Sequence, residues 1–145
     1  IELPYSEKLI NEEKEFDKIF SKMSDQINLW KKNKIDQISN FNNQGKKIVA
    51  KAFPGRAAIL IRILGIDENT IDAVYEKNGS KKIGHYVPGT RIPILSDENL
   101  FNSDESFIIL NLAWHIPAEI RNYLKLNNVD SEVIDIISEH DFIQK

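Results

Sequence analysis

The chain has 145 residues, 41% of them hydrophobic, and its 19 basic and 22 acidic residues nearly balance to a formal net charge of -3. This length and composition predict one compact unit with a real hydrophobic core. The near neutrality excludes a general electrostatic attraction to nucleic acid or to an anionic membrane, so any bound anion must be met by local groups.

The first 45 residues (1–45) are predicted to form an N-terminal helical segment. Residues 6–41 contain neither proline nor glycine, Ser6 is placed to cap the first turn, and NNQG (42–45) is a stop signal. The pattern indicates a long amphipathic helix, or two in succession. Its apolar residues recur at helical spacing: Phe16, Phe20, Met23, Ile27, Trp30, Ile38 and Phe41. We expect this stripe to pack against the rest of the domain, and the alternative is that it also braces a preceding domain.

The pattern changes after Gly45, and residues 46–145 are predicted to form a second, α/β unit. KKIVAKAF (46–53) suits a buried strand, and PGRAAILIRILG (54–65) suits a helix with Pro54 in its first turn and Gly65 past its end. A further helix is predicted at 117–126, where it begins with proline. Further strands are predicted at 71–75, 92–95, 106–114 and 132–138.

Strands that alternate with helices predict parallel pairing through right-handed crossovers. The expected fold class is therefore α/β, a Rossmann-like, doubly wound and mainly parallel sheet with helices on both faces, preceded by the long amphipathic helix. Ligands of such sheets bind outside the carboxyl ends of the strands. The segments FPGR, EKNG and AWHIP follow the first, second and fourth predicted strands and should all face that side.

The segment AKAFPGRAA (50–58) occupies the position of the glycine-rich turn in dinucleotide-binding folds. Backbone N–H groups at a helix start can receive a phosphate there, with Arg56 adding positive charge, and Glu76 lies about twenty residues on, where a ribose-binding acid is often found. One glycine does not make the usual fingerprint, which weakens the hypothesis of a minimal NAD-dependent enzyme. An ordinary strand-to-helix turn is the alternative for both residues.

No nucleophile and base can be paired from the sequence. His115 follows a strand and could serve as a base, although a packed histidine near Trp114 is the better interpretation. The carboxylate pairs at 12–13 and 97–98 fall in contexts expected to be solvated. We therefore expect no catalysis by this chain alone and no catalytic residue in it.

Neither a metal site nor a membrane segment is expected. The chain has no cysteine, which excludes disulfides and thiolate ligands, and His85, His115 and His140 lack ligand-like spacing. No apolar run approaches the length of a membrane span, and the opening IELPYSEK has neither the features of a signal peptide nor an initiator methionine. We expect the inside of a longer, cytoplasmic polypeptide.

Three segments together resemble a known family: AFPGRAAILIRILGI (52–66), GHYVPGTRIPI (84–94) and LNLAWHIPAEI (110–120). Their order and spacing are similar to the C-terminal domain of sugar C-methyltransferases, and the similarity runs from about Lys46 to the C-terminus. Those enzymes use S-adenosylmethionine to methylate a carbon of a keto-deoxysugar carried on a nucleotide diphosphate. They have a zinc-binding region, a central methyl-transferring domain and a C-terminal Rossmann-like domain that helps to enclose the sugar nucleotide.

The first family motif usually runs G-Y-G-A-P-A-K-G-N-T-L-L. Pro54 matches its proline and Arg56 stands for its lysine, while Ala50, Ala52 and Ala57 stand where glycines are usual. Without these glycines, we do not expect the backbone to approach a phosphate closely.

The second motif, usually G-R-Y-T-P-G-T-H-I-P-I, is the most specific match. His85 replaces its arginine and Arg91 its histidine. The matching residues are Gly84, Tyr86, Pro88, Gly89, Thr90, Ile92, Pro93 and Ile94.

The third motif, usually L-L-P-W-N-F-A-D-E-I, matches at Trp114, Glu119 and Ile120, with His115 in place of the asparagine. A further family segment, usually D-R-N-P-x-K-Q, appears before Gly84 with altered spacing.

The resemblance implies a C-terminal, non-methyl-transferring domain. This domain is expected to bind no cofactor itself. The resemblance implies that S-adenosylmethionine binds to an upstream methyltransferase domain of the same polypeptide. We expect the YVPGT loop to meet the Trp114–His115 loop at the edge of a cleft that binds a nucleotide sugar; for Pro93 and Ile94 a structural role is expected. A docking or protein-interaction module that no longer binds a sugar nucleotide is the alternative. The implied substrate-binding residues are Pro54, Gly55, Arg56, Tyr86, Pro88, Gly89, Thr90, Trp114 and His115.

Overall fold

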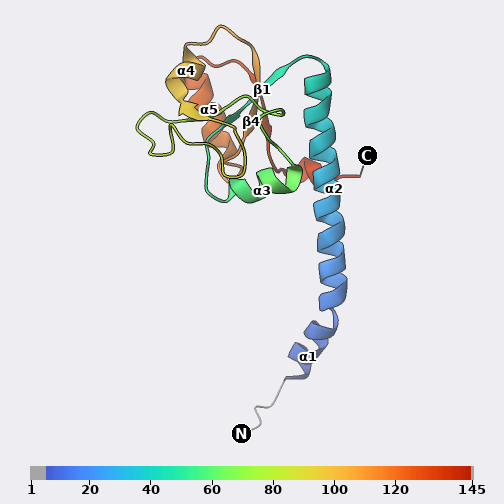
Figure 1. Ribbon diagram of the computed structural model, residues 1–145. Coiled ribbons are helices and arrows are strands. Elements are labelled where there is room, and N and C mark those ends of the chain that lie inside the picture. Colours follow the sequence, from blue (N-terminus) through green and yellow to red (C-terminus); the bar gives the residue numbers. More distant parts are fainter. Residues whose placement is uncertain (1–5, 145) are drawn as a thin grey trace.

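Two successive helices lead into the α/β body of this computed structural model, which describes residues 6–144 (Figure 1). Helix α1 spans Glu7–Lys14 and helix α2 spans Phe16–Asn43. The Ser6 side chain accepts a hydrogen bond from the Leu9 amide, as predicted for the N-cap. Gly45 has a φ of 72°, a left-handed conformation that suits glycine and ends the helical segment where the NNQG signal predicted.

The body is built on a five-stranded sheet in the order β3-β2-β1-β4-β5, with every pair parallel. The strands are β1 Lys47–Lys51, β2 Val74–Glu76, β3 Ile94–Ser96, β4 Phe107–Asn111 and β5 Glu132–Asp135. The strand order reverses between β1 and β4, so the predicted doubly wound fold is confirmed. The carboxyl ends of these two neighbouring strands are paired, with Lys51 opposite Asn111.

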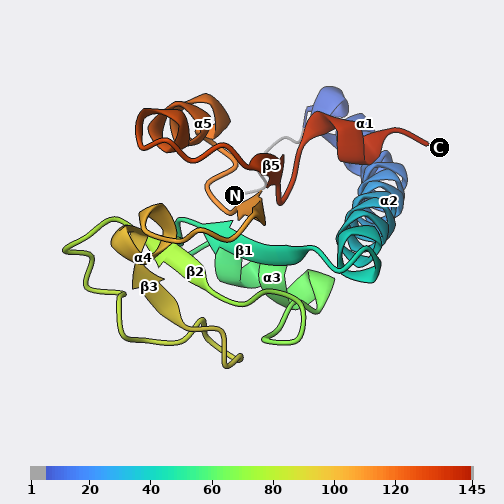
Figure 2. The same ribbon diagram turned by 90° about the horizontal axis from the view of Figure 1, so that it is seen from above.

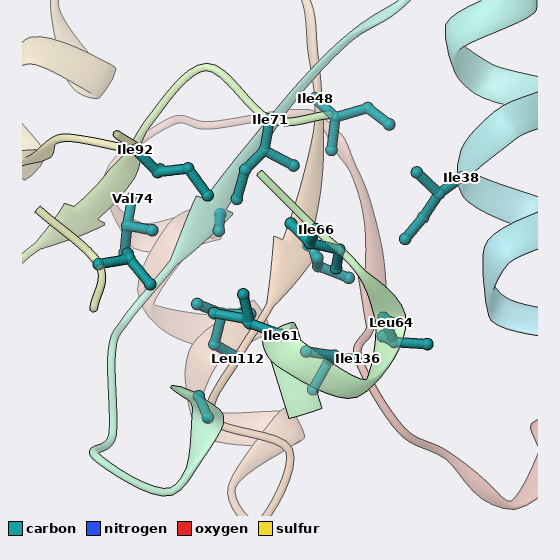
Figure 3. Packing of buried hydrophobic residues seen from close by; sticks show 14 of the residues in the cluster. Ile38, Ile48, Ile61, Leu64, Ile66, Ile71, Val74, Ile92, Leu112 and Ile136 are labelled. Atoms are coloured by element: carbon teal, nitrogen blue, oxygen red, sulfur yellow. The ribbon is translucent and has the colours of Figure 1, made fainter. Parts of the chain in front are cut away.

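Helices cover both faces of the sheet (Figure 2). Helix α3 (Ala57–Leu64) and helix α2 pack on one face, and α4 (Asp97–Phe101) and α5 (Pro117–Leu126) pack on the other. The first face holds the larger core, where Ile38 of α2 lies near Ile48 of β1 and Leu64 of α3 (Figure 3). Alternate strand residues enter the two cores because successive side chains of a strand point to opposite faces.

Several element boundaries differ from the sequence-based expectation. Strand β4 ends at Asn111 rather than at residue 114, because the Asn111 side chain turns back to accept a 2.9 Å hydrogen bond from the Ala113 amide. Helix α3 starts at Ala57, so Pro54 lies in the preceding turn rather than inside the helix. Helix α4 and a 3-10 helix at Glu139–Phe142 were not predicted.

The middle of α2 is fixed to the C-terminal segment of the chain. The indole nitrogen of Trp30 donates a 2.9 Å hydrogen bond to the Ile136 carbonyl. The Lys34 ammonium lies 3.0 Å from a carboxylate oxygen of Asp141, and both side chains are buried. These contacts hold α2 against the body through residues near the end of the sequence.

The apolar stripe of α2 is only half covered. The expected packing against the body holds for Trp30 and Ile38, which are buried. It is wrong for the first half of the stripe, because α2 projects past the body there (Figure 1). The uncovered residues are Phe16, Phe20, Met23 and Ile27, which are 44–61% exposed.

No helix within residues 6–144 combines the length and apolar character that crossing a membrane requires.

Candidate functional site

The turn between β1 and α3 lies at the carboxyl edge of the sheet. It begins with Ala52, whose φ of 65° is unusual for a residue that carries a Cβ atom. The Phe53 amide donates a 2.7 Å hydrogen bond to Oε1 of Glu76 at the end of β2. Lys82 contributes from the next loop, since its ammonium donates to the Phe53 carbonyl and lies 3.6 Å from the Glu76 carboxylate. Glu76 therefore closes the turn, which favours the ordinary-turn interpretation over a ribose-binding acid.

Arg56 is the cation of this turn. It is the N-cap residue of α3, and its side chain is exposed. Within residues 6–144 its guanidinium makes neither an ion pair nor a hydrogen bond, and the amides of Gly55 and Arg56 are likewise free of protein acceptors. A helix start with free amides and an unpaired guanidinium can receive an anion.

The turn between β4 and α5 leaves the sheet beside the β1–α3 turn, because Lys51 and Asn111 are paired at the strand ends. Trp114 is half-buried and packs against the core on the α2 and α3 face. His115 is exposed, and its ring meets the Trp114 ring edge to face with the centroids 5.9 Å apart. The structure thus places the Pro54–Arg56 turn and the Trp114–His115 turn at the ends of neighbouring strands.

The YVPGT loop does not join them, so the expected meeting with the Trp114–His115 loop is wrong. The chain reverses before β3: Tyr86 forms an antiparallel bridge with Pro93, and the Val87 amide donates to the Ile92 carbonyl. The loop therefore precedes the amino end of β3, on the opposite side from the carboxyl edge. The expectation of a loop at the edge of a cleft did not include this reversal.

The turn formed by residues 87–90 lies against α3 instead. Pro88, Gly89 and Thr90 line a groove of about 600 Å³ together with residues from the end of that helix, among them Arg62. The Thr90 hydroxyl donates to the Val87 carbonyl at 2.9 Å and accepts from an amide within the same turn. This hydroxyl shapes the turn, and the predicted contact with a sugar is not supported by its position.

Sequence reasoning missed a buried polar cluster at the carboxyl edge, formed by Lys51, Asp97 and Tyr123. The Lys51 ammonium lies 2.9 Å from Oδ2 of Asp97, and the Tyr123 hydroxyl donates to the same oxygen at 2.7 Å. The Asp97 side chain is only 3% exposed, so its predicted solvated context is wrong. Oδ1 of Asp97 is also buried and has no hydrogen-bond partner. The one available signal was a lysine inside the segment 46–53, which was otherwise expected to be a buried strand.

This cluster holds the edge together rather than exposing reactive groups. It joins the end of β1, the start of α4 and the middle of α5. Burial, followed by the hydrogen bond and charge of Asp97, raises the pKa of Tyr123 well above its ordinary value. The phenol is therefore a poor acid at neutral pH.

A second polar cluster fixes α5 to the last strand. Arg121 contacts the Asp135 carboxylate through two guanidinium nitrogens at 2.9 and 3.0 Å. The side-chain amide of Asn111 donates to the same carboxylate at 2.8 Å. Neither cluster contains a nucleophile beside a base. Over residues 6–144, no group of three or more His, Asp or Glu side chains is arranged to hold a metal ion.

Comparison with known proteins gives one family. The family model described as "C-methyltransferase C-terminal domain" matches residues 5–136, a range that includes both N-terminal helices and all five strands. None of the curated proteins matches this chain.

Proposed function

Because this chain belongs to the C-methyltransferase C-terminal domain family, we propose that it forms the non-methyl-transferring part of an enzyme that methylates a nucleotide-linked keto-deoxysugar. It works with an upstream methyltransferase domain of the same polypeptide. Its own contribution is to help to enclose the sugar nucleotide at the carboxyl edge of its sheet.

One observation carries this proposal. The β1–α3 and β4–α5 turns flank the point where the strand order reverses, which is where ligands of doubly wound sheets bind. Arg56 supplies a cation and free amides at a helix start, and these suit a diphosphate. Trp114 and His115 supply aromatic surface one strand away, and this suits a base or a sugar ring. Pro54 and Gly55 shape the turn that presents Arg56.

S-adenosylmethionine is the methyl donor that the family implies, and the residues of this chain do not fit it. A Rossmann-like fold receives such a cofactor at a glycine-rich first turn, where the backbone must approach the ligand closely. Here Ala52 carries a methyl group at that turn, and the Phe53 amide is already bonded to Glu76. The cofactor site is therefore assigned to the methyltransferase domain, and no step of the reaction is placed in this chain.

A docking module that no longer binds a sugar nucleotide is the second candidate. The same two features favour it, since they remove space and one amide donor from the β1–α3 turn. It differs from the first candidate in predicting that nucleotides do not bind.

Titration of the 15N-labelled chain with dTDP and with UDP separates the two candidates. If the chain binds a sugar nucleotide, the amide chemical shifts of residues 53–58 and 113–116 should change. Those of residues 88–90, which lie away from the carboxyl edge of the sheet, should stay constant. Binding should be weak because the other domain supplies much of the cleft. Absence of any change at millimolar nucleotide, or changes centred on residues 88–90, would reject nucleotide binding at the carboxyl edge.

A further inference from the structure

The uncovered half of α2 continues the face that packs against the body. Phe16, Phe20, Met23, Ile27 and Trp30 follow one another at alternating spacings of four and three residues. This spacing keeps side chains on one side of a helix. Trp30 is 2% exposed, whereas the four residues before it are largely exposed. The same helix face is therefore a core face in one half and an open apolar face in the other.

A second apolar surface lies beside it. Helix α3 buries Ala57, Ile61 and Leu64 against the sheet, whereas Ile59 and Ile63 lie on its opposite side and are 63% and 36% exposed. Figure 1 shows α3 on the side of the body from which the free half of α2 projects. Helix α3 contacts α2, so the two helices border one corner of the body where the free half of α2 begins.

The composition of this corner fits a protein partner. The stripe consists of phenylalanine, methionine and isoleucine, and no charged residue lies at its centre. Such a composition is typical of the core of a protein interface. Charged side chains flank the stripe, and residues 7–29 contain six acidic and four basic residues. A helix that lies on an anionic membrane needs a lysine- and arginine-rich polar face, which this helix lacks. Such an apolar patch on a water-facing helix marks an interaction site.

We propose that this corner, formed by the uncovered stripe of α2 and the outer side of α3, is the docking surface for the methyltransferase domain. The family supplies the occupant, because a C-terminal domain of a C-methyltransferase accompanies a catalytic domain. The inference rests on the proposed function only in taking a methyltransferase domain as the partner. The proposed surface identifies where the methyltransferase domain docks. A domain docked there leaves the carboxyl edge of the sheet free for substrate.

The test measures binding of this chain to a methyltransferase domain from an enzyme of the same family, purified without its own C-terminal domain, by isothermal titration calorimetry. The double variant Phe20→Asp/Met23→Asp should bind at least tenfold more weakly, because it places two charges in the apolar stripe. The matched control, Ser21→Asp/Asn28→Asp, adds the same charge to the same helix away from the stripe and should change the Kd less than twofold. Both variants should keep the wild-type melting temperature, since the changed residues are exposed.

Four outcomes overturn the proposal. The first is that the methyltransferase domain does not bind the wild-type chain, and the second is that the stripe variant binds it as tightly as the wild type does. The third is self-association of the chain that the stripe variant abolishes while the domain does not bind. The fourth is binding of the wild-type chain to anionic phosphatidylserine vesicles in place of the domain. The dTDP titration is run on the stripe variant in parallel. Retained nucleotide binding there shows that a failed docking surface leaves the proposed function intact.

Discussion

The Trp30 indole nitrogen donates a 2.9 Å hydrogen bond to the carbonyl of Ile136, which is 106 residues away in the sequence. Trp30 is the first residue of the stripe on α2 that the body covers, and this contact joins it to the segment that follows β5. Trp30 also belongs to the larger core, where it packs with residues of α3 and of the sheet. One side chain thus connects the N-terminal helix, the core and the C-terminal segment.

Replacing Trp30 by alanine should lower the free energy of unfolding by about 3–5 kcal/mol, since it removes a buried ring and leaves a cavity. Trp30→Phe keeps much of the ring but leaves the Ile136 carbonyl without its donor, at a cost of about 1–3 kcal/mol. Phe20→Ala on the open half of the stripe is the control and should change stability by less than about 0.5 kcal/mol. Urea unfolding followed by circular dichroism measures all three. Equal effects of Trp30→Ala and Phe20→Ala would contradict the described packing.

The buried Asp97 cluster predicts a loss of stability at alkaline pH. The folded chain raises the pKa of Tyr123, so the unfolded chain releases this proton first, near its ordinary pKa of about 10. The contribution of Tyr123 is therefore complete below about pH 10 and declines as the pH rises above that value. Tyr123→Phe should be less stable than the wild type at pH 8 and should lose less stability between pH 9 and pH 11.5. Parallel declines in the two proteins would show that Tyr123 is not the group responsible.

Ala52→Gly should stabilise the protein slightly. A non-glycine residue in the left-handed region costs about 1–2 kcal/mol, and glycine removes this cost. The greater conformational freedom of glycine in the unfolded chain offsets about 0.4–1 kcal/mol of this stabilisation. We expect a net gain of about 0.5–1 kcal/mol in the unfolding free energy. The matched control is Ala58→Gly inside α3, which should lose about 1 kcal/mol. A destabilised Ala52→Gly variant would mean that the packing of the Ala52 methyl group outweighs the backbone strain.

Arg56→Ala should weaken dTDP binding about tenfold, because a charge-assisted hydrogen bond to an anion contributes about 1.5–3 kcal/mol. Arg62→Ala provides the control, since it removes an exposed arginine from the last turn of the same helix. The Kd from the amide titration measures both. Equal weakening by the two variants would indicate a general charge effect rather than a site at the β1–α3 turn.

The chain by itself should not transfer a methyl group from labelled S-adenosylmethionine to a keto-sugar nucleotide. It offers neither a glycine-rich cofactor turn nor a nucleophile beside a base in the described residues. Scintillation counting of the sugar product measures this directly. Transfer above the background of a protein-free reaction would overturn the assignment of chemistry to another domain.

The sequence alone determined the order and type of most elements. Alternation of apolar runs with helical patterns, together with the glycine and proline signals around residues 45, 65 and 117, predicted a parallel doubly wound sheet. The strand order β3-β2-β1-β4-β5 confirms it. The motif resemblance also indicated the family, which the family match over residues 5–136 confirms. These features are readable because periodicity and turn chemistry act between residues close in the sequence.

Only the tertiary structure decided which surfaces and side chains meet. The stripe on α2 predicted an apolar face, but periodicity does not reveal what covers that face, and the body reaches only as far as Trp30. Lys51 and Asp97 are 46 residues apart and meet because β1 and β3 lie in one sheet with β2 between them. The YVPGT turn lies at the amino end of β3 because the chain reverses before that strand, and this reversal depends on long-range backbone pairing that no local pattern of the sequence encodes.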